Sequence, residues 1–257
     1  MTSLLEQFLV ANIYAILMVV ARVGSGLMVM PGIGEAYVSS RARILLAVAI
    51  AVVIAPVIGP KLPPLPSSAW GMGLLLLAEI YIGVALGLVC RIMISAMHVA
   101  GMTMAYQSGL ALATQFDASQ AAQGSMMGNL LSITAILVIF GTDLHYLMLR
   151  GLSDSYDIFA PGAYLPVEDF ASYFSRLFAD VFTLGIKLAS PAIVVGLLLY
   201  LGAGVLARLM PNMQVFFVLM PPQIYLGFFI FMAVFTSILF EFTEFFTEHL
   251  ETFLRGF

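Results

Sequence analysis

Six long apolar segments constrain the fold of this chain more than any other feature. An α-helix crosses the hydrocarbon core of a bilayer with about 20 mostly apolar residues. Because lipid offers no hydrogen bonds to backbone N–H and C=O groups, such segments must be helical. We therefore predict an all-α polytopic membrane protein of about six long, partly broken helices arranged as hairpins. The segments are residues 9–30, 44–58, 70–97, 128–148, 181–206 and 215–240.

Proline residues are predicted to interrupt the last two segments. Ser190-Pro191 lies inside the fifth segment, and Pro221-Pro222 lies near the start of the sixth. Proline removes a helical hydrogen bond and clashes with the preceding turn. Broken helices of this kind occur where neighbouring helices satisfy the freed backbone groups.

The composition agrees with a membrane protein and limits its partners. Of 257 residues, 62% are hydrophobic and 9% are charged, whereas a soluble domain is about 25% charged. The formal net charge of -4 argues against a nucleic-acid partner, because phosphate binding needs clustered Lys and Arg. Cys90 is the only cysteine, so no intrachain disulfide is possible. The first seven residues contain no basic side chain, which favours an uncleaved first helix over a signal peptide.

No arrangement of residues typical of an enzyme occurs in the sequence. It has no Cys pair, no H-E-x-x-H, no G-x-S-x-G and no Walker A motif, and His98, His145 and His249 are isolated. We therefore predict that the chain is not an enzyme and holds no metal or cofactor.

The stretch from Ala100 to Gly128 differs from the apolar segments on either side of it. Its polarity comes from amides and hydroxyls, and Asp117 is its only formal charge. Non-helical backbone at membrane depth persists only where protein buries it or where it lines a watery cavity. We interpret the stretch as the lining or plug of a path. The candidate plug residues are Tyr106, Gln107, Ser108, Gly109, Leu110, Gln115, Phe116, Asp117 and Gln120.

Methionines in and next to this stretch suggest a deformable seal. Met side chains are flexible and polarisable, so they close around variable shapes. The candidates are Met97, Met102, Met104 and Met126, and continuation of the third helix would place Met93, Met97 and Met104 on one face. For any single Met, ordinary core filling is the alternative.

Ionisable residues inside the apolar segments are the other candidates for a function. Arg22, Glu79, Arg91 and Lys187 are of this kind, and buried charges usually face a partner or a water-filled path. Arg22 in the first helix and Glu79 in the third could form an ion pair. Such a pair either fixes helix packing or belongs to a transport path, and the sequence leaves both open while favouring the first.

Two polar regions near the fifth and sixth segments repeat at helical spacing. Residues 170–181 predict an amphipathic lead-in to the fifth helix, and a helix that lies at the membrane interface is the alternative. The C-terminus predicts an acidic amphipathic helix over about 238–257, with one apolar and one charged stripe. Lipid surfaces are anionic, so this helix is expected to pack on a protein partner or to extend the sixth helix into solvent. The apolar stripe is Phe242, Phe245, Phe246, Leu250, Phe253, Leu254 and Phe257, and the charged stripe is Glu241, Glu244, Glu248, Glu251 and Arg255.

Motifs along the whole chain follow the order and spacing of a known family. They are Arg22 with Pro31-Gly32, Arg41 and Arg43, Glu79-x-x-x-Gly83-x-x-x-Gly87, Gly101 to Gly109, His145 with Ser155-Tyr156, Ala189-Ser190-Pro191, Gly202, Ala207-Arg208-Leu-Met-Pro211, Val215-Phe216 and Pro221. Together they resemble the flagellar biosynthesis protein R (FliR-like) family, an export-gate subunit shared with injectisome type III secretion. Two positions depart from that pattern. The amides of Pro211-Asn212-Met213-Gln214 are exchanged relative to the usual Pro-Gln-x-Asn, and Leu219 stands where Gly is common.

The resemblance implies an export-gate subunit of the bacterial inner membrane and flagellar basal body. Its partners would be several copies of the P and Q subunits, the associated B-type switch subunit and flagellar proteins in transit. Residues 1–257 would be one export-gate domain, with a P-like part over about 1–180 and a Q-like hairpin over about 181–240. The candidate hairpin-turn residues are Arg208, Pro211, Gln214 and Phe216.

The family's central plug corresponds by this resemblance to residues 106–123. Unfolded flagellar proteins would pass there, driven by energy that other subunits supply. A stand-alone small-solute or ion transporter that uses Arg22 and Glu79 is the alternative function.

Overall fold

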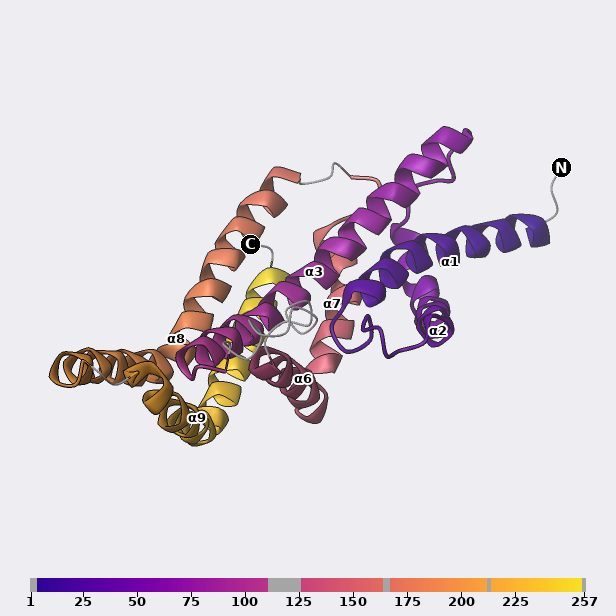
Figure 1. Ribbon diagram of the computed structural model, residues 1–257. Helices are drawn as coiled ribbons and strands as arrows, with labels where there is room; N and C mark the ends of the chain where they lie inside the picture. The colour runs from indigo at the N-terminus through magenta and orange to yellow at the C-terminus, as the bar shows by residue number, and fades with distance from the viewer. Residues whose placement is uncertain (1–3, 111–125, 164–166, 212–213, 256–257) are drawn as a thin grey trace. The chain divides into compact units, whose positions relative to one another are not determined.

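The computed structural model describes residues 4–110, 126–163, 167–211 and 214–255 (Figure 1). Over these ranges the chain is built from helices and short connections, without a strand. The predicted all-α class is confirmed. The elements are α1 (Leu4–Val29), α2 (Ser40–Ile58), the 3₁₀ turn η1 (Gly59–Lys61), α3 (Ala69–Gln107), α6 (Met126–Gly141), α7 (Leu144–Ile158), α8 (Val167–Leu209) and α9 (Val215–Leu254).

Five of the described helices are long and apolar enough to cross a membrane, in agreement with a polytopic membrane protein. They are α1, α2, α3, α8 and α9. The helices α6 and α7 together form a sixth candidate, but they meet at a bend of 77°. The bend lies at the short connection that contains Asp143, whose φ is +61°. Asp tolerates this left-handed conformation better than most residues, so the helix ends here and restarts in a new direction.

The structure does not place helix breaks at the predicted proline positions. α8 continues through Pro191, and α9 continues through Pro221 and Pro222. In both cases the prediction of an interruption is wrong. A proline removes only one helical donor, and the apolar residues on both sides of it keep the rest of the helix favourable in a membrane.

The helix α2 shows why the protein must sit in an apolar environment. Its buried face carries Ala47, Ala51 and Ala55, whereas Leu45 and Val53 are 70% and 75% exposed. Small residues inside and large apolar residues outside let helix backbones approach closely while lipid or partner proteins cover the outer face. In water this arrangement would expose a large apolar surface.

The described helices form two compact units. Unit 1 comprises Met1–Ile92, Thr142–Leu177 and Phe246–Phe257, and unit 2 comprises Met93–Gly141 and Phe178–Phe245. The core of unit 1 contains Met18, Val23, Leu27, Leu86, Met148, Leu152, Tyr156, Phe170 and Phe253. The core of unit 2 contains Met93, Met97, Met104, Leu131, Ala135, Ile139, Leu184, Leu188 and Phe242. The P-like and Q-like parts remain a prediction from the resemblance.

The described part of the C-terminal amphipathic segment forms the end of α9, and buried residues of its apolar stripe pack on the chain itself, whereas Phe257 lies outside the described residues. Phe246 and Phe253 are fully buried in unit 1. The Phe253 ring centroid lies 5.0 Å from that of Tyr173 and 6.4 Å from that of Phe170. A separate protein partner was predicted to cover this helix, but at Phe253 the aromatic residues at the start of α8 do so instead. The acidic residues Glu244, Glu248 and Glu251 stay exposed.

Candidate functional site

A buried arginine with a full set of hydrogen bonds lies in unit 1. Arg22 is 0% exposed, and its partner Glu79 is 1% exposed. Arg22 Nε donates to Glu79 Oε2 at 2.6 Å, and Nη2 donates to Oε1 at 3.0 Å. This is a bidentate pair between α1 and α3, in the planar geometry that arginine forms best with a carboxylate.

The remaining arginine donors bind the end of α7. Nη1 donates to the carbonyl oxygen and the hydroxyl of Ser155, at 3.1 Å and 3.2 Å. Nη2 also donates to the carbonyl oxygen of Phe159 at 3.0 Å. The Tyr156 ring lies under the guanidinium, whose carbon is 3.9 Å from the ring centroid. All five guanidinium N–H groups thus have acceptors, and the buried charge is compensated.

Glycines make the close approach of α1 and α3 possible. A β-carbon on Gly83 of α3 would overlap the Arg22 carbonyl oxygen and the Ser25 hydroxyl of α1. A β-carbon on Gly87 would lie 2.7 Å from the carbonyl oxygen of Gly26. The predicted Gly83-x-x-x-Gly87 motif is therefore a packing motif, and it brings Glu79 within reach of Arg22.

The geometry of Arg22 and Glu79 favours the structural interpretation over a transport path. Neither side chain has surface at which a solute or ion would bind. The arginine uses every donor on protein acceptors, so a passing anion would have to displace one of them. The hydrogen bonds of Arg22 connect α1, α3 and α7. The pair also neutralises both charges inside apolar helices, where an unpaired charge is costly.

The two other predicted intramembrane charges lie at the surface of their units. Lys187 of α8 is 64% exposed and donates to Glu241 of α9 at 2.6 Å. Arg91 of α3 is 49% exposed and lies 3.9 Å from Glu35. Both pairs are more accessible than Arg22, so each needs water or a partner protein near it.

The structure describes the first half of the candidate plug residues. α3 extends to Gln107, ten residues beyond the predicted end of the third segment, and Gly109 follows with a φ of +74°. Glycine adopts this left-handed conformation without strain and commonly ends helices. Tyr106 is exposed, and Ser108 is 3% exposed. Leu110 is half-buried. The candidates Gln115, Phe116, Asp117 and Gln120 lie outside the described residues.

The helices on the two sides of the candidate plug stretch cross closely in unit 2. A β-carbon on Gly101 of α3 would lie 2.6 Å from the nitrogen and Cα of Gly128 in α6. A β-carbon on Gly128 would lie 3.0 Å from His98 Nδ1. The two backbones therefore touch at a pair of glycines, which fixes how the chain enters and leaves the stretch between them.

The candidate seal methionines differ in exposure. Met97 and Met104 are 0% and 2% exposed in the core of unit 2. Met102 is 37% exposed and Met126 is 88% exposed. A shared role as a seal stays a prediction for all four, and the two exposed side chains are the ones placed to meet another molecule.

The hairpin-turn candidates lie where α8 and α9 meet. α8 ends at Leu209 with Arg208 in its last turn, and α9 begins at Val215. Arg208, Pro211 and Gln214 are exposed. Phe216 lies in the first turn of α9, and its side chain is not among those described.

Sequence reasoning missed two polar groups that the structure brings into contact with predicted residues. Ser155 entered only as part of a family motif, yet it binds Arg22. Gln223 was not singled out, yet its amide donates to the carbonyl oxygen of Gln107. An amide within an apolar helix is the signal for Gln223, because polar groups in such helices usually have a specific partner.

Comparison with known proteins identifies the family. Residues 13–249 match the model of a family described as bacterial export proteins, family 1. The chain belongs to this family.

Curated relatives of this export protein come from flagellar and other export systems. It is 32% identical to the flagellar biosynthetic protein FliR of Caulobacter vibrioides over 242 residues, which cover 94% of this chain and 96% of the relative. It is 30% identical to the FliR of Pectobacterium carotovorum over 199 residues, 77% of this chain and 75% of the relative. The Yop proteins translocation protein T of Yersinia pestis is 27% identical over 161 residues, 62% of each chain. The resemblance to a FliR-like export protein is thus confirmed.

Proposed function

We propose that the chain is a subunit of the flagellar type III protein export gate, in which it forms part of the conduit across the inner membrane. The similarity over nearly its full length to a flagellar biosynthetic protein carries this proposal. The apolar helices and their large exposed apolar side chains agree with a subunit that is surrounded by lipid and partner subunits. The chain acts as a passage for unfolded proteins, and other subunits supply the energy.

In this proposal the chain functions inside a hetero-oligomer at the flagellar basal body. One copy assembles with several copies of the P and Q subunits and with the B-type switch subunit. The exposed side chains of α8 and α9 support such an assembly. Leu197 and Leu201 on α8 are 59% and 61% exposed, and Phe229 and Met232 on α9 are 66% and 69% exposed.

The stretch after α3 is proposed as the central plug of the conduit. Its lack of basic residues and its amide and glycine content support this role. The close crossing at Gly101 and Gly128 supports it too, because the helices on both sides of the stretch are held in contact. A closed gate needs such fixed supports to keep small ions out.

A solute transporter remains the alternative function, and the pair Arg22–Glu79 does not favour it. Both side chains are inaccessible and compensated by the protein. A transporter would also function as a monomer or a symmetric homomer, whereas an export-gate subunit requires different partner chains.

Native mass spectrometry of the tagged chain, extracted gently from its host, tests the assembly. We expect a large hetero-complex with one copy of this chain and several copies of two other small membrane proteins. A stable monomer or a symmetric homomer without partners would overturn the proposed function.

Deletion of residues 110–120 tests the plug. In assembled complexes the deletion is expected to make cells permeable to small ions or dyes. Unchanged permeability, with the complex still assembled, would contradict the plug assignment while leaving the assembly intact.

A further inference from the structure

The end of α3 is contacted by two other helices of unit 2, and a side chain of one of them forms a hydrogen bond to it. The last four carbonyl oxygens of a helix have no partner inside the helix, and the carbonyl oxygen of Gln107 is one of them. It accepts a hydrogen bond of 2.9 Å from Nε2 of Gln223 in α9. Gln223 is 8% exposed, and the hydrogen bond itself is partly buried.

The neighbouring turn of α9 contacts the next residue of the chain. Gly227 follows Gln223 by one helical turn, and a β-carbon at Gly227 would overlap the side chain of Ser108. Ser108 is 3% exposed. Gln223 therefore supplies the hydrogen bond, and Gly227 supplies the space that lets α9 approach the end of α3.

The helix α8 likewise contributes a glycine and a hydrogen-bonding side chain near the end of α3. Gly196 lies against the side chain of Gln107, and a β-carbon at Gly196 would be 3.3 Å from the Gln107 β-carbon. One turn later, the hydroxyl of Tyr200 accepts the second hydrogen bond of Gln223 Nε2 at 3.3 Å. Each helix thus contributes one glycine and one hydrogen-bonding side chain, four residues apart.

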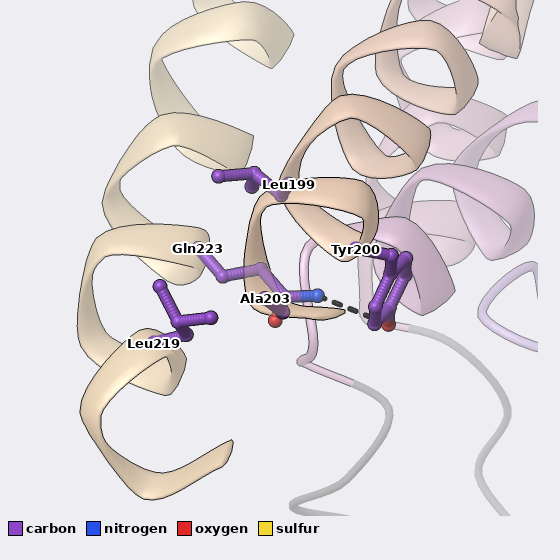
Figure 2. A pocket seen from close by; sticks show the side chains of 5 residues that line it. All are labelled: Leu199, Tyr200, Ala203, Leu219 and Gln223. Atoms are coloured by element: carbon purple, nitrogen blue, oxygen red, sulfur yellow. Dashed lines mark hydrogen bonds between the residues drawn. The ribbon is translucent and has the colours of Figure 1, made fainter. Parts of the chain in front are cut away.

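Gly196, Tyr200, Gln223 and Gly227 form what we call the α3-end site. Figure 2 shows Gln223 pointing from α9 toward Tyr200 of α8, next to Leu199, Ala203 and Leu219. The cavity that these side chains line has a volume of about 40 Å³. Such a volume has room for a few water molecules only.

We propose that Gln223 is a positioning residue of the export gate, which fixes the end of α3 and thereby the start of the plug stretch. This inference rests on the proposed function. Both amide hydrogens of Gln223 bind acceptors on other helices. An apolar side chain of the same size would leave the Gln107 carbonyl oxygen without this partner, which is costly for a carbonyl that is partly shielded from water.

Disulfide trapping tests the position of the α3 end. Gln107→Cys and Gly196→Cys are combined with Cys90→Ala, which removes the only native cysteine. The two β-carbons would lie 3.3 Å apart, slightly below the range of about 3.5–4.5 Å found in disulfides, so a separation of a few tenths of an ångström brings them into bonding geometry. Gln107→Cys changes only the side chain, so the backbone carbonyl that accepts the hydrogen bond from Gln223 is still present. We expect rapid cross-linking by a mild oxidant in the assembled complex, and its absence would overturn the site.

Substitution of Gln223 in the double-cysteine background tests its role. Gln223→Met keeps the size of the side chain without the hydrogen bonds, and Gln223→Glu keeps its shape without the amide donors. Both variants are expected to slow cross-linking about tenfold. Loss of one hydrogen bond weakens the positioned state of the α3 end by about 1.4 kcal/mol, which corresponds to a tenfold lower population of that state. Tyr225→Phe is the matched control, because Tyr225 is 79% exposed on the same helix. Equal rates for Gln223→Glu and the control would overturn the proposal.

A compensating pair separates positioning from general instability. Gly227→Ala is expected to displace Ser108 and to slow cross-linking. Ser108→Gly, added to it, removes the overlapping side chain and is expected to restore most of the rate. Failure of this rescue, with normal complex yield, would show that the contact does not set the position of the α3 end.

Permeability links the site to the gate. In chains without added cysteines, Gln223→Glu is expected to raise dye entry in the same direction as deletion of residues 110–120, but less strongly. If the deletion leaks and Gln223→Glu does not, the positioning role is wrong. If neither leaks although cross-linking follows the expected pattern, the plug assignment fails and the α3-end geometry stands.

Discussion

Arg22 of α1 and Glu79 of α3 form a bidentate ion pair, with hydrogen bonds of 2.6 Å and 3.0 Å, in a place that solvent does not reach. The pair is completed by Ser155 and Phe159 at the end of α7. Three helices that are far apart in the sequence are therefore held by one guanidinium group.

Replacement of Arg22 or Glu79 alone should destabilise the chain strongly. Arg22→Met leaves an unpaired carboxylate, and Glu79→Met leaves an unpaired guanidinium, each at a cost of about 3–5 kcal/mol. The double variant Arg22→Met/Glu79→Met should recover much of this loss, because no charge is left unpaired. Cellular level and thermal stability of the assembled complex measure the effect.

The exposed pair Arg150–Asp154 provides the control. Arg150 is 75% exposed, so Arg150→Met should change the level of the chain little. If Arg22 served transport, Arg22→Met would keep normal stability but alter the ion permeability of the cells. That outcome would contradict the structural interpretation.

Two glycines of α3 should respond to alanine with opposite sign. Gly101→Ala places a methyl group against the backbone of Gly128, and such overpacking costs about 1–3 kcal/mol. Gly73→Ala meets nothing within 4 Å and should stabilise the helix by up to about 1 kcal/mol through its higher helix propensity. Melting temperatures of the two variants, compared with the unmodified chain, decide the point. An equal or higher value for Gly101→Ala would be incompatible with the glycine crossing.

The exposed acidic stripe of α9 should matter for assembly and not for the fold. Glu244, Glu248 and Glu251 are exposed, while Phe242, Phe246, Leu250 and Phe253 of the apolar stripe are buried. Replacement of the three by Lys should lower the yield of the hetero-complex at an unchanged level of the free chain, and replacement by Gln should lower it less. Co-purification with the partner subunits measures this. Full yield of the Lys variant would mean that the stripe is only solvated.

Exchange of the charges of Lys187 and Glu241 tests whether their attraction matters. Lys187→Glu places two carboxylates together and should reduce the level of the complex, since like charges repel. The double variant Lys187→Glu/Glu241→Lys restores opposite charges at the same place and should recover the level. Quantitative blotting of membrane fractions compares the variants. Equal levels for the single and double variants would show that the pair contributes nothing.

Local sequence patterns were sufficient for the helices and for the family. Long apolar runs predict membrane helices because hydropathy adds up over neighbouring residues, and this holds for α1, α2, α3, α8 and α9. The pairing of Arg22 with Glu79 was also accessible, because a buried charge in an apolar helix requires an opposite charge nearby.

The breaks of the helices were harder to predict. Pro191 suggested an interruption, yet α8 continues through it, and the sharp bend lies instead near Asp143. A proline weakens a helix by a fixed local amount, but the surrounding packing decides whether the helix ends there.

The sequence by itself therefore determined the class of protein, the approximate places of its long apolar segments, and the family. Only the tertiary structure decided that Ser155 and Phe159 complete the shell of Arg22, that the C-terminal aromatic stripe packs on its own chain, and that Gln223 binds the end of α3. The physical reason is distance along the chain. Helix formation depends on neighbouring residues, whereas each of these contacts joins groups more than 70 residues apart, whose meeting depends on how all the helices pack together.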